Sequence, residues 1–362
     1  MGELGGSAMG TKRQRREFLR NLVGWGLGVW GLAQGGCATR SHPPVTEGSA
    51  QPSTPPTTSD APTASKRAKV VVVRDPKCIR DDGTLHEERL RTMLAQALCE
   101  LSGERSPEAA WQHYVTPTDV VGLKLNCLAG RGLSTHVELV RALAAGLAAA
   151  GVKESNIIAW DRTDRELRQA GFEIRDGGAG FRCFGTDHVG YDPKLVVKGK
   201  IGGLLSSILT VHTTALINVP VLKDHGLAGV SGCLKNNFGC IHNPNKYHPN
   251  NCDPYIADLN SLPQIRDKQR LIICDATRLQ YHGGPGFKPQ WAEPYGALLL
   301  STDPVALDTV GAKIIADLRA THNLPSLEEE NRPPKHIATA ASAAYHLGVA
   351  EGEKIEVVER TV

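Results

Sequence analysis

The side chains best suited to chemistry in this sequence gather between residues 218 and 258. The stretch Asn-Val-Pro-Val-Leu-Lys-Asp-His-Gly places Lys223 and His225 two positions apart, so both point to one side of an extended chain. Lys235 follows within Ser-Gly-Cys-Leu-Lys-Asn-Asn-Phe-Gly. Together these three side chains could surround an anionic group. The alternative is that the two lysines lie on the surface and that His225 caps a turn.

The glycines between these residues would let a ligand approach the backbone closely. If Ser231 caps a helix that starts here, free backbone N–H groups would face the same crevice as the lysines. We therefore expect Gly229, Ser231 and Gly232 to contribute to binding a ligand or cofactor.

A second set of side chains lies just after the first and consists of metal-ligand types. Its members are Cys240, His242, His248 and Cys252, with Cys233 nearby. Their spacing matches no zinc motif. The alternative is a set of disulfides or free buried thiols, because the chain has nine cysteines and loss or lipidation of one leaves an even number.

Several well-known motifs are missing from the sequence. There is no phosphate-binding loop, no dinucleotide fingerprint and no His-Glu-x-x-His. Gly229-Val-Ser-Gly-Cys233 approaches a nucleophile elbow but lacks the final glycine. Because Cys-x-x-Cys does not occur, we do not expect a resident ferredoxin-type iron–sulfur cluster, and the cofactor stays unknown.

The elements that must position these residues alternate between strand and helix. This rhythm predicts an α/β fold with a mainly parallel sheet and helices on both sides, in three layers. Ser134 is the expected N-cap of one helix, and Asp303 with the proline after it opens another. The expected strands are residues 69–74, 120–126, 157–161, 215–221, 271–275, 297–300 and 354–358, and the expected helices are 87–101, 135–150, 303–318 and 336–347.

This arrangement places two groups of residues at one edge of the sheet. Lys223 and His225 follow a buried strand, so they emerge at its carboxyl end, where ligands of open α/β sheets gather. Asp275 ends another predicted strand and reaches the same edge if the two strands run parallel. We therefore expect Asp275 on the wall of the pocket.

Composition allows one large domain and argues against a nucleic-acid partner. The chain has 362 residues, 41% hydrophobic and 22% charged, with a formal net charge of only +3. Aromatic residues make up 5%, which does not suit a surface for stacking bases. No basic stripe marks the predicted domain at residues 69–362.

The first 37 residues have the pattern of an export signal. Arg15-Arg16-Glu-Phe-Leu-Arg20 is similar to the twin-arginine motif, and a short glycine-rich apolar stretch at residues 22–33 follows it. That stretch is too short to span a bilayer. We expect the twin-arginine machinery as a partner and a periplasmic or membrane-anchored location.

The end of this signal has two interpretations. Residues 32–37 form a lipoprotein-like box that would anchor the chain through Cys37, although Gln34 departs from the usual pattern. The competing interpretation is cleavage after Gly35. Residues 38–68 are rich in Pro, Ser and Thr, so we expect a disordered linker.

Several stretches together resemble a known protein family. They are Gly-Leu-Lys-Leu-Asn at 122–126, Asn-Val-Pro-Val-Leu-Lys-Asp-His at 218–225, Leu-Lys-Asn-Asn-Phe-Gly at 234–239, Asp-Ala at 275–276 with Gly-Gly-Pro at 283–285, and Ser-Thr-Asp-Pro-Val-Ala-Leu-Asp at 301–308. In this order they resemble the domain of unknown function 362 (DUF362). Several members of that family carry a ferredoxin-like iron–sulfur segment whose cysteines this chain lacks.

The resemblance implies candidate positions more than an activity. It supports Lys223, His225 and Lys235 as site residues and adds Asn236, Asp275 and Asp308. For Asn236 the alternative is a bond to the backbone in a tight turn, and for Asp303 a helix cap. Asp308 would pair with a site lysine.

Two functions remain open at this point. One is an enzyme, redox or metal-dependent, that acts on a small anionic molecule near Lys223 and His225. The other is a periplasmic lipoprotein that binds a metal or ligand for a membrane partner without turnover.

Overall fold

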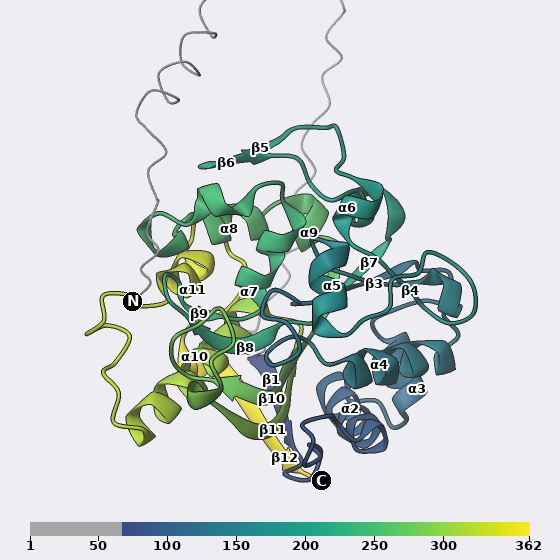
Figure 1. Ribbon diagram of the computed structural model, residues 1–362, viewed down its shortest axis with the longest axis horizontal. Coiled ribbons are helices and arrows are strands. Elements are labelled where there is room, and N and C mark those ends of the chain that lie inside the picture. The colour runs from purple at the N-terminus through teal and green to yellow at the C-terminus, as the bar shows by residue number, and fades with distance from the viewer. Residues whose placement is uncertain (1–66) are drawn as a thin grey trace, which may run out of the picture. The chain divides into compact units, whose positions relative to one another are not determined.

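Ten of the strands of the computed structural model, which describes residues 67–362, form one large sheet (Figure 1). Its order is β12-β1-β11-β10-β7-β2-β3-β4, with β8 and β9 attached to β10, and β5 and β6 form a separate pair. The strands are β1 (Ala68–Arg74), β2 (Val121–Lys124), β3 (Ile157–Trp160), β4 (Arg182–Cys183), β5 (Val196–Lys198), β6 (Ile201–Gly203), β7 (Ala215–Asn218), β8 (Val221–His225), β9 (Gly229–Ser231), β10 (Gln269–Gln280), β11 (Ala292–Ser301) and β12 (Ile355–Thr361).

The sheet is mainly parallel, which confirms the predicted fold class. Strands β4, β3, β2, β7 and β10 pair in parallel, as do β1 and β12. The antiparallel pairs are β1 with β11, β10 with β11, and β8 with β9. The alternating strand and helix pattern predicted the parallel part. The antiparallel pair of long strands, β10 and β11, arises because only a short 3₁₀ turn, Pro289–Trp291, and no α-helix separates them.

Helices cover both faces of the sheet, so the molecule has three layers. In β1, Val70 and Val72 contribute to one core cluster with α7, α8, α10 and α11, whereas Val71 and Val73 contribute to the other with α2, α3 and α4. Successive strand residues point to opposite faces, so a run of four buried valines fills both cores. The helices are α2 (Glu87–Ser102), α3 (Pro107–Gln112), α4 (Val137–Ala149), α5 (Asp164–Ala170), α6 (Thr186–Val189), α7 (Cys233–Asn236), α8 (Tyr255–Asn260), α9 (Pro263–Arg266), α10 (Pro304–Thr321) and α11 (Lys335–Ala341).

One predicted strand is in fact two. The strand expected at 215–221 ends at Asn218, and β8 starts at Val221, because Pro220 between them has no N–H to give to the ladder. β7 and β8 both pair in parallel with β10, with Val221 opposite Asp275. After the break, the chain continues alongside β10, so Lys223 and His225 lie on a strand that is paired with the same neighbour as β7.

Helix starts agree with the expectation in one case and differ in another. Asp303 caps α10 by accepting hydrogen bonds from the N–H groups of Val305 and Ala306. Helix α4, however, begins at Val137 with His136 as its N-cap, so Ser134 is not the cap. The hydroxyl of Thr135, next to Ser134, is already bonded to the backbone of Asn126 and Val219, which holds this stretch out of the helix.

The export signal, the alternative anchor at Cys37 and residues 38–66 of the predicted linker lie outside residues 67–362, and Ala68, the last residue of that linker, already belongs to β1. The described residues belong to a compact unit, Ala64–Val362. Within that part of the chain, no helix is both long and apolar enough to cross a membrane.

Candidate functional site

A cavity of about 440 Å³ opens where several strands end. Lys124 is the last residue of β2, Asp161 follows β3, and Lys223 and His225 belong to β8. Helix α7 adds residues from the other side. We call this cavity the three-lysine pocket; the polar side chains that line it are Lys124, Asn126, Asp161, Arg162, Glu166, Lys223, His225, Ser231, Lys235, Asn236, Asn245 and His248.

The first lysine of the pocket is neutralised by a neighbouring carboxylate. Lys124 is 1% exposed, and its Nζ donates to Asp161 Oδ1 at 2.8 Å and to the carbonyl of Leu125 at 2.6 Å. Asp161 also accepts hydrogen bonds from the backbone N–H groups of Cys127 and Arg162. These hydrogen bonds hold both side chains in place. The Lys124–Asp161 pair is therefore a fixed part of the pocket lining.

Three asparagines connect this pair to the other lysines. Asn236 Nδ2 donates to Asn218 Oδ1 at 2.8 Å and to the carbonyl of Lys124 at 3.1 Å, and its Oδ1 accepts from Asn126 Nδ2 at 3.1 Å. Asn126 Oδ1 in turn accepts from Lys223 Nζ at 2.8 Å. Each amide oxygen in this network faces a donor and each amide nitrogen faces an acceptor, so the orientation of the side-chain amides is fixed. The network therefore also orients Lys223.

Lys223 is a buried cation without a carboxylate partner. It is 1% exposed, and its Nζ donates only to Asn126 Oδ1 and to the carbonyl of Leu133, at 3.3 Å, among the described residues. Burial lowers the pKa of its ammonium to about 8, although Asp161 opposes that shift. Lys223 therefore carries a charge at neutral pH that the folded chain only partly compensates.

Lys235, which comes from α7, is in a similar situation. Its Nζ lies 3.2 Å from His248 Nε2 and 4.0 Å from the centre of the Phe238 ring. Burial lowers the pKa of Lys235 to about 8. A neutral imidazole and an aromatic face stabilise a cation weakly compared with a carboxylate.

The two histidines of the pocket are neutral, and their hydrogen bonds fix which nitrogen carries the proton. His225 Nδ1 accepts from the N–H groups of Leu227 and Ala228, so its proton is on Nε2. His248 Nδ1 faces the carbonyl of Pro244 at 3.1 Å, so its Nε2 accepts from Lys235. Burial, together with Lys235, lowers the pKa of His225 to about 2 and also lowers that of His248.

The lining as a whole is positively charged. Four cationic side chains and two carboxylates line the pocket, and both histidines are neutral. Two positive charges are therefore uncompensated, and they belong to Lys223 and Lys235, since Arg162 pairs with Glu166 as Lys124 does with Asp161. Such a lining can hold a small anion and can exchange protons with it.

The structure brings six of the thirteen predicted site residues together. Lys223, His225, Lys235 and Asn236 line one pocket, with Ser231 and His248 beside them. Sequence reasoning missed Lys124, Asn126 and Asp161. The signal was present, because Asn126 and Asp161 end two predicted strands, at 120–126 and 157–161, that are parallel neighbours in the sheet, and Lys124 lies two positions before Asn126.

Asp275 does not line the pocket, contrary to the expectation. Strand β10 continues to Gln280, so Asp275 lies within the strand and not at its end. Its side chain accepts from His136, with Oδ2 2.8 Å from Nδ1, and from Thr277. Although burial opposes both shifts, this contact raises the pKa of His136 and lowers that of Asp275.

Asp308 also has another role than the expected one. Its carboxylate accepts from the backbone N–H groups of Cys233 (2.7 Å) and Leu234 (3.0 Å), the first residues of α7. Asp308 therefore caps α7, and within residues 67–362 it pairs with no lysine. Burial raises its pKa to about 6, and the hydrogen bonds from α7 limit that rise.

Of the three residues expected to bind a ligand, Ser231 lines the pocket, whereas Gly229 and Gly232 do not. Gly232, not Ser231, is the N-cap of α7, and the N–H groups expected to be free already bind Asp308. A Cβ on Gly232 would lie 2.1 Å from Asp308 Oδ1, and one on Gly229 would lie 2.3 Å from the carbonyl of Arg332. Both glycines are needed for packing within the protein.

The predicted metal ligands do not converge. Within residues 67–362, no group of three or more His, Cys, Asp or Glu side chains could hold a metal ion. Cys240 is buried against Asn237, His242 packs its ring on Tyr191, and His248 is turned toward Lys235. Cys252 and the other seven described cysteines are free thiols.

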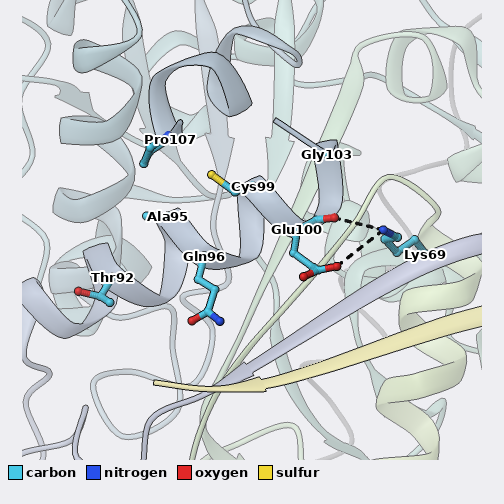
Figure 2. A pocket seen from close by; sticks show the side chains of 8 residues that line it. All are labelled: Lys69, Thr92, Ala95, Gln96, Cys99, Glu100, Gly103 and Pro107. Carbon is cyan, nitrogen blue, oxygen red and sulfur yellow. Dashed lines mark hydrogen bonds and ion pairs between the residues drawn. The ribbon is translucent and has the colours of Figure 1, made fainter. Parts of the chain in front are cut away.

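A larger hollow of about 660 Å³ lies along α2 (Figure 2). Its lysine, Lys69, donates to the carbonyl of Glu100 at 3.2 Å and lies 4.0 Å from Glu100 Oε1. The remaining residues drawn there are small or uncharged, such as Ala95 and Thr92. Because its one cation is paired, this hollow carries no candidate chemistry.

Several solved structures are similar to this chain, among them two at low identity. A crystal structure of a Thermotoga maritima protein has 12% identity and a TM-score of 0.41, with 66% of this chain and 60% of that chain covered. The lactate racemase apoprotein from Thermoanaerobacterium thermosaccharolyticum has 13% identity and a TM-score of 0.38, with 70% and 58% covered. The chain thus spans less than two thirds of either protein. No curated sequence matches it.

A family model gives a firmer result. It matches residues 121–313, from the start of β2 into α10, and so takes in more than half of the chain and every residue that lines the three-lysine pocket. Its description is Domain of unknown function, DUF362. The chain therefore belongs to the DUF362 family.

Proposed function

We propose that the three-lysine pocket binds a small molecule with about two negative charges. The observation that carries this proposal is the pair of buried, uncompensated ammonium groups of Lys223 and Lys235. Burying an unpaired charge is costly, so proteins keep such charges where a partner completes them. An anionic ligand would supply the missing carboxylate or phosphate.

The ligand class follows from the lining. Lysine ammonium groups bind phosphate and carboxylate oxygens as point charges, and the neutral His225 offers its Nε2–H as a further donor. A cavity of about 440 Å³ is in the range that holds small metabolites. Phosphate monoesters and dicarboxylates fit both requirements, whereas a metal cation would be repelled by the net positive lining.

The test is a binding titration on the full-length chain. A panel of phosphate monoesters and dicarboxylates is titrated by calorimetry at pH 7 into the wild type, Lys223→Met, Lys235→Met and the exposed control Lys153→Met. Loss of one charge-assisted contact should lower affinity by about 10- to 100-fold in the two pocket variants. Equal affinity in all four proteins, or no binding by the wild type, would refute the pocket.

A second function, proton transfer on the bound anion, is favoured by one contact. Lys235 donates to His248 at 3.2 Å, and its pKa of about 8 is close to the range in which a side chain can both give and take a proton. Lys235→Arg keeps the charge but cannot lose a proton. It should retain binding and lose any exchange of ligand C–H for deuterium seen by ¹H NMR. If exchange persists in this variant, Lys235 is not the group that transfers the proton. If the wild type shows no exchange, the second function is refuted and only the proposed binding function stands.

Export remains a proposal that rests on Arg15 and Arg16. Replacing both with lysine should keep the protein in the cytoplasm, as followed by cell fractionation. Labelling with a radioactive fatty acid distinguishes an anchor at Cys37 from cleavage after Gly35. Unchanged export of the lysine variant would show that Arg15 and Arg16 are not part of a twin-arginine signal.

A further inference from the structure

A second polar cavity, of about 400 Å³, lies at the start of α4. Helix α4 has 13 residues, and its N-cap, His136, forms no side-chain cap. Among the described residues, the N–H groups of Val137, Glu138 and Leu139 have no hydrogen-bond partner. Free N–H groups and the positive end of the helix dipole favour an anion at this position.

Ser134 provides an independent observation at the same place. It is 2% exposed and lines this cavity, yet its Oγ makes no hydrogen bond to the protein. A buried hydroxyl is normally satisfied, so an unpartnered one indicates a missing acceptor. Its neighbour Thr135 shows the usual case, because the hydroxyl of Thr135 bonds to backbone groups on both sides.

Three arginines surround this cavity: Arg131, Arg141 and Arg278. None of them forms an ion pair within residues 67–362, and Arg278 makes only a long contact, 3.5 Å, with the carbonyl of Gly132. The carboxylates at the cavity are Asp82, whose Oδ1 is occupied by Thr84, and Glu138. With His136 held by Asp275, the net charge is positive.

We propose that this arginine cavity, formed by Arg131, Arg141, Arg278, Ser134 and the first turn of α4, binds an oxyanion group, with phosphate as the best match. Arginine presents paired N–H groups that fit two oxygens of one phosphate. The hydroxyl of Ser134 and the N–H groups of α4 would complete its coordination. Neither the family model nor the proposed function assigns this site, and it does not depend on the three-lysine pocket.

The two cavities share one loop. Lys223 of the three-lysine pocket holds the carbonyl of Leu133, and the next residue, Ser134, lines the arginine cavity. The oxyanion would therefore bind one side of the loop while Lys223 holds the other side. A ligand with two anionic groups, or two separate ligands, could fix this loop from both sides.

The test uses inorganic phosphate and the full-length chain carrying Lys235→Met, which weakens the other pocket. Calorimetry at pH 7 and low salt should show one binding event. Arg141→Gln with Arg278→Gln should lower its affinity by about 100-fold, since two charge-assisted contacts are lost. The exposed control Arg165→Gln should leave it unchanged.

Ser134→Ala keeps the test independent of folding. Because Ser134 Oγ has no protein partner, this change should leave the melting temperature the same or raise it, while phosphate affinity falls by about tenfold. Phosphate binding in the Lys235→Met background that is absent, or equally strong in the arginine, serine and control variants, would overturn the proposal.

Discussion

Two neighbouring residues of β8 lead to opposite arrangements of buried charge. Asp224 points to Arg332 and Arg319, which also bind Glu330, and its second oxygen accepts from the N–H of Gly284 at 2.8 Å. Lys223, one position earlier, points into the three-lysine pocket, where no carboxylate pairs with it. We call the first group the Asp224 cluster. All its charges have partners within the described chain, whereas two charges of the pocket have none.

This difference separates a structural network from a binding site. Both regions hold several buried ionisable groups, and both would be noticed in a search for unusual side chains. In the Asp224 cluster the fold supplies every partner, so its charges hold Gly284 and the residues around Arg332 to β8. In the pocket the fold supplies amides and neutral histidines, which orient the lysines without neutralising them. The incomplete region is therefore the better candidate for function.

The largest expected effect is on the stability of the Asp224 cluster. Asp224→Asn removes the charge shared by Arg319 and Arg332, and breaking a buried ion pair costs about 3–5 kcal/mol of unfolding free energy. Urea denaturation at pH 7 measures it. The control is Asp317→Asn, an exposed partner of Lys313, which should change stability by less than about 1 kcal/mol. Similar losses in both variants would contradict the comparison.

The opposite sign is expected in the pocket. Lys235→Met replaces an uncompensated buried cation by an apolar side chain of similar length, so the free energy of unfolding should rise, by on the order of 1 kcal/mol. Urea denaturation of this variant beside Lys153→Met makes the measurement. A loss of more than about 2 kcal/mol in Lys235→Met would mean that Lys235 belongs to a structural network after all.

The pocket residues that the sequence predicted share a local signal. Lys223 and His225 are two positions apart beyond a buried stretch, and a strand then has to aim both at one side. Asn126 and Asp161 could have been included by the same logic, since each ends a predicted strand, and Lys124 lies two positions before Asn126. What could not be predicted was the role of Asp308, because its partners Cys233 and Leu234 are 75 and 74 residues away in the chain.

The errors have physical reasons as well. The predicted strand at 271–275 ends at Asp275, whereas β10 continues to Gln280. Nothing in the local sequence at Ala276 and Thr277 indicates this continuation. Ser134 has the right residue type for an N-cap, but the hydrogen bonds of Thr135 to distant backbone groups delay the helix to Val137. Such contacts depend on the assembled sheet and leave no mark in a local pattern.

A smaller effect is the dependence on pH. Lys223 and Lys235 have folded pKa values of about 8, below the usual 10.5 that applies to the unfolded chain. Between these values the unfolded state binds more protons, so these lysines make the free energy of unfolding rise with pH from about 8 to 10.5. The rise should be smaller in Lys235→Met.

The pH measurement has to be a difference between the two proteins. Burial raises the pKa of thiols such as Cys240 to about 12. Because the unfolded thiol loses its proton first, these groups make the free energy of unfolding fall as the pH rises in an overlapping range. Denaturation curves of the wild type and Lys235→Met at pH 7, 8, 9 and 10 cancel this common contribution. Anion affinity should fall over the same interval, because the lysines lose their protons. Parallel stability curves would show that Lys235 keeps its proton in the folded state.

The smallest expected effect is on the histidines that face Lys235. Burial is the main cause of the low pKa of His225, and the charge of Lys235 comes next; for His248 the order is the same. In Lys235→Met both pKa values should rise, and His248 should titrate closer to its usual value of 6.5, since it is the less buried of the two and is in direct contact with Lys235. Two-dimensional ¹H–¹⁵N spectra that report imidazole tautomers measure this between pH 4 and 8, with Arg165→Gln as the control.

His225 should stay neutral over that range, because the hydrogen bonds from Leu227 and Ala228 to its Nδ1 require an unprotonated nitrogen. If the His248 titration is the same in wild type and variant, Lys235 does not carry its charge beside that ring, and the uncompensated cation that distinguishes the pocket from the Asp224 cluster is lost.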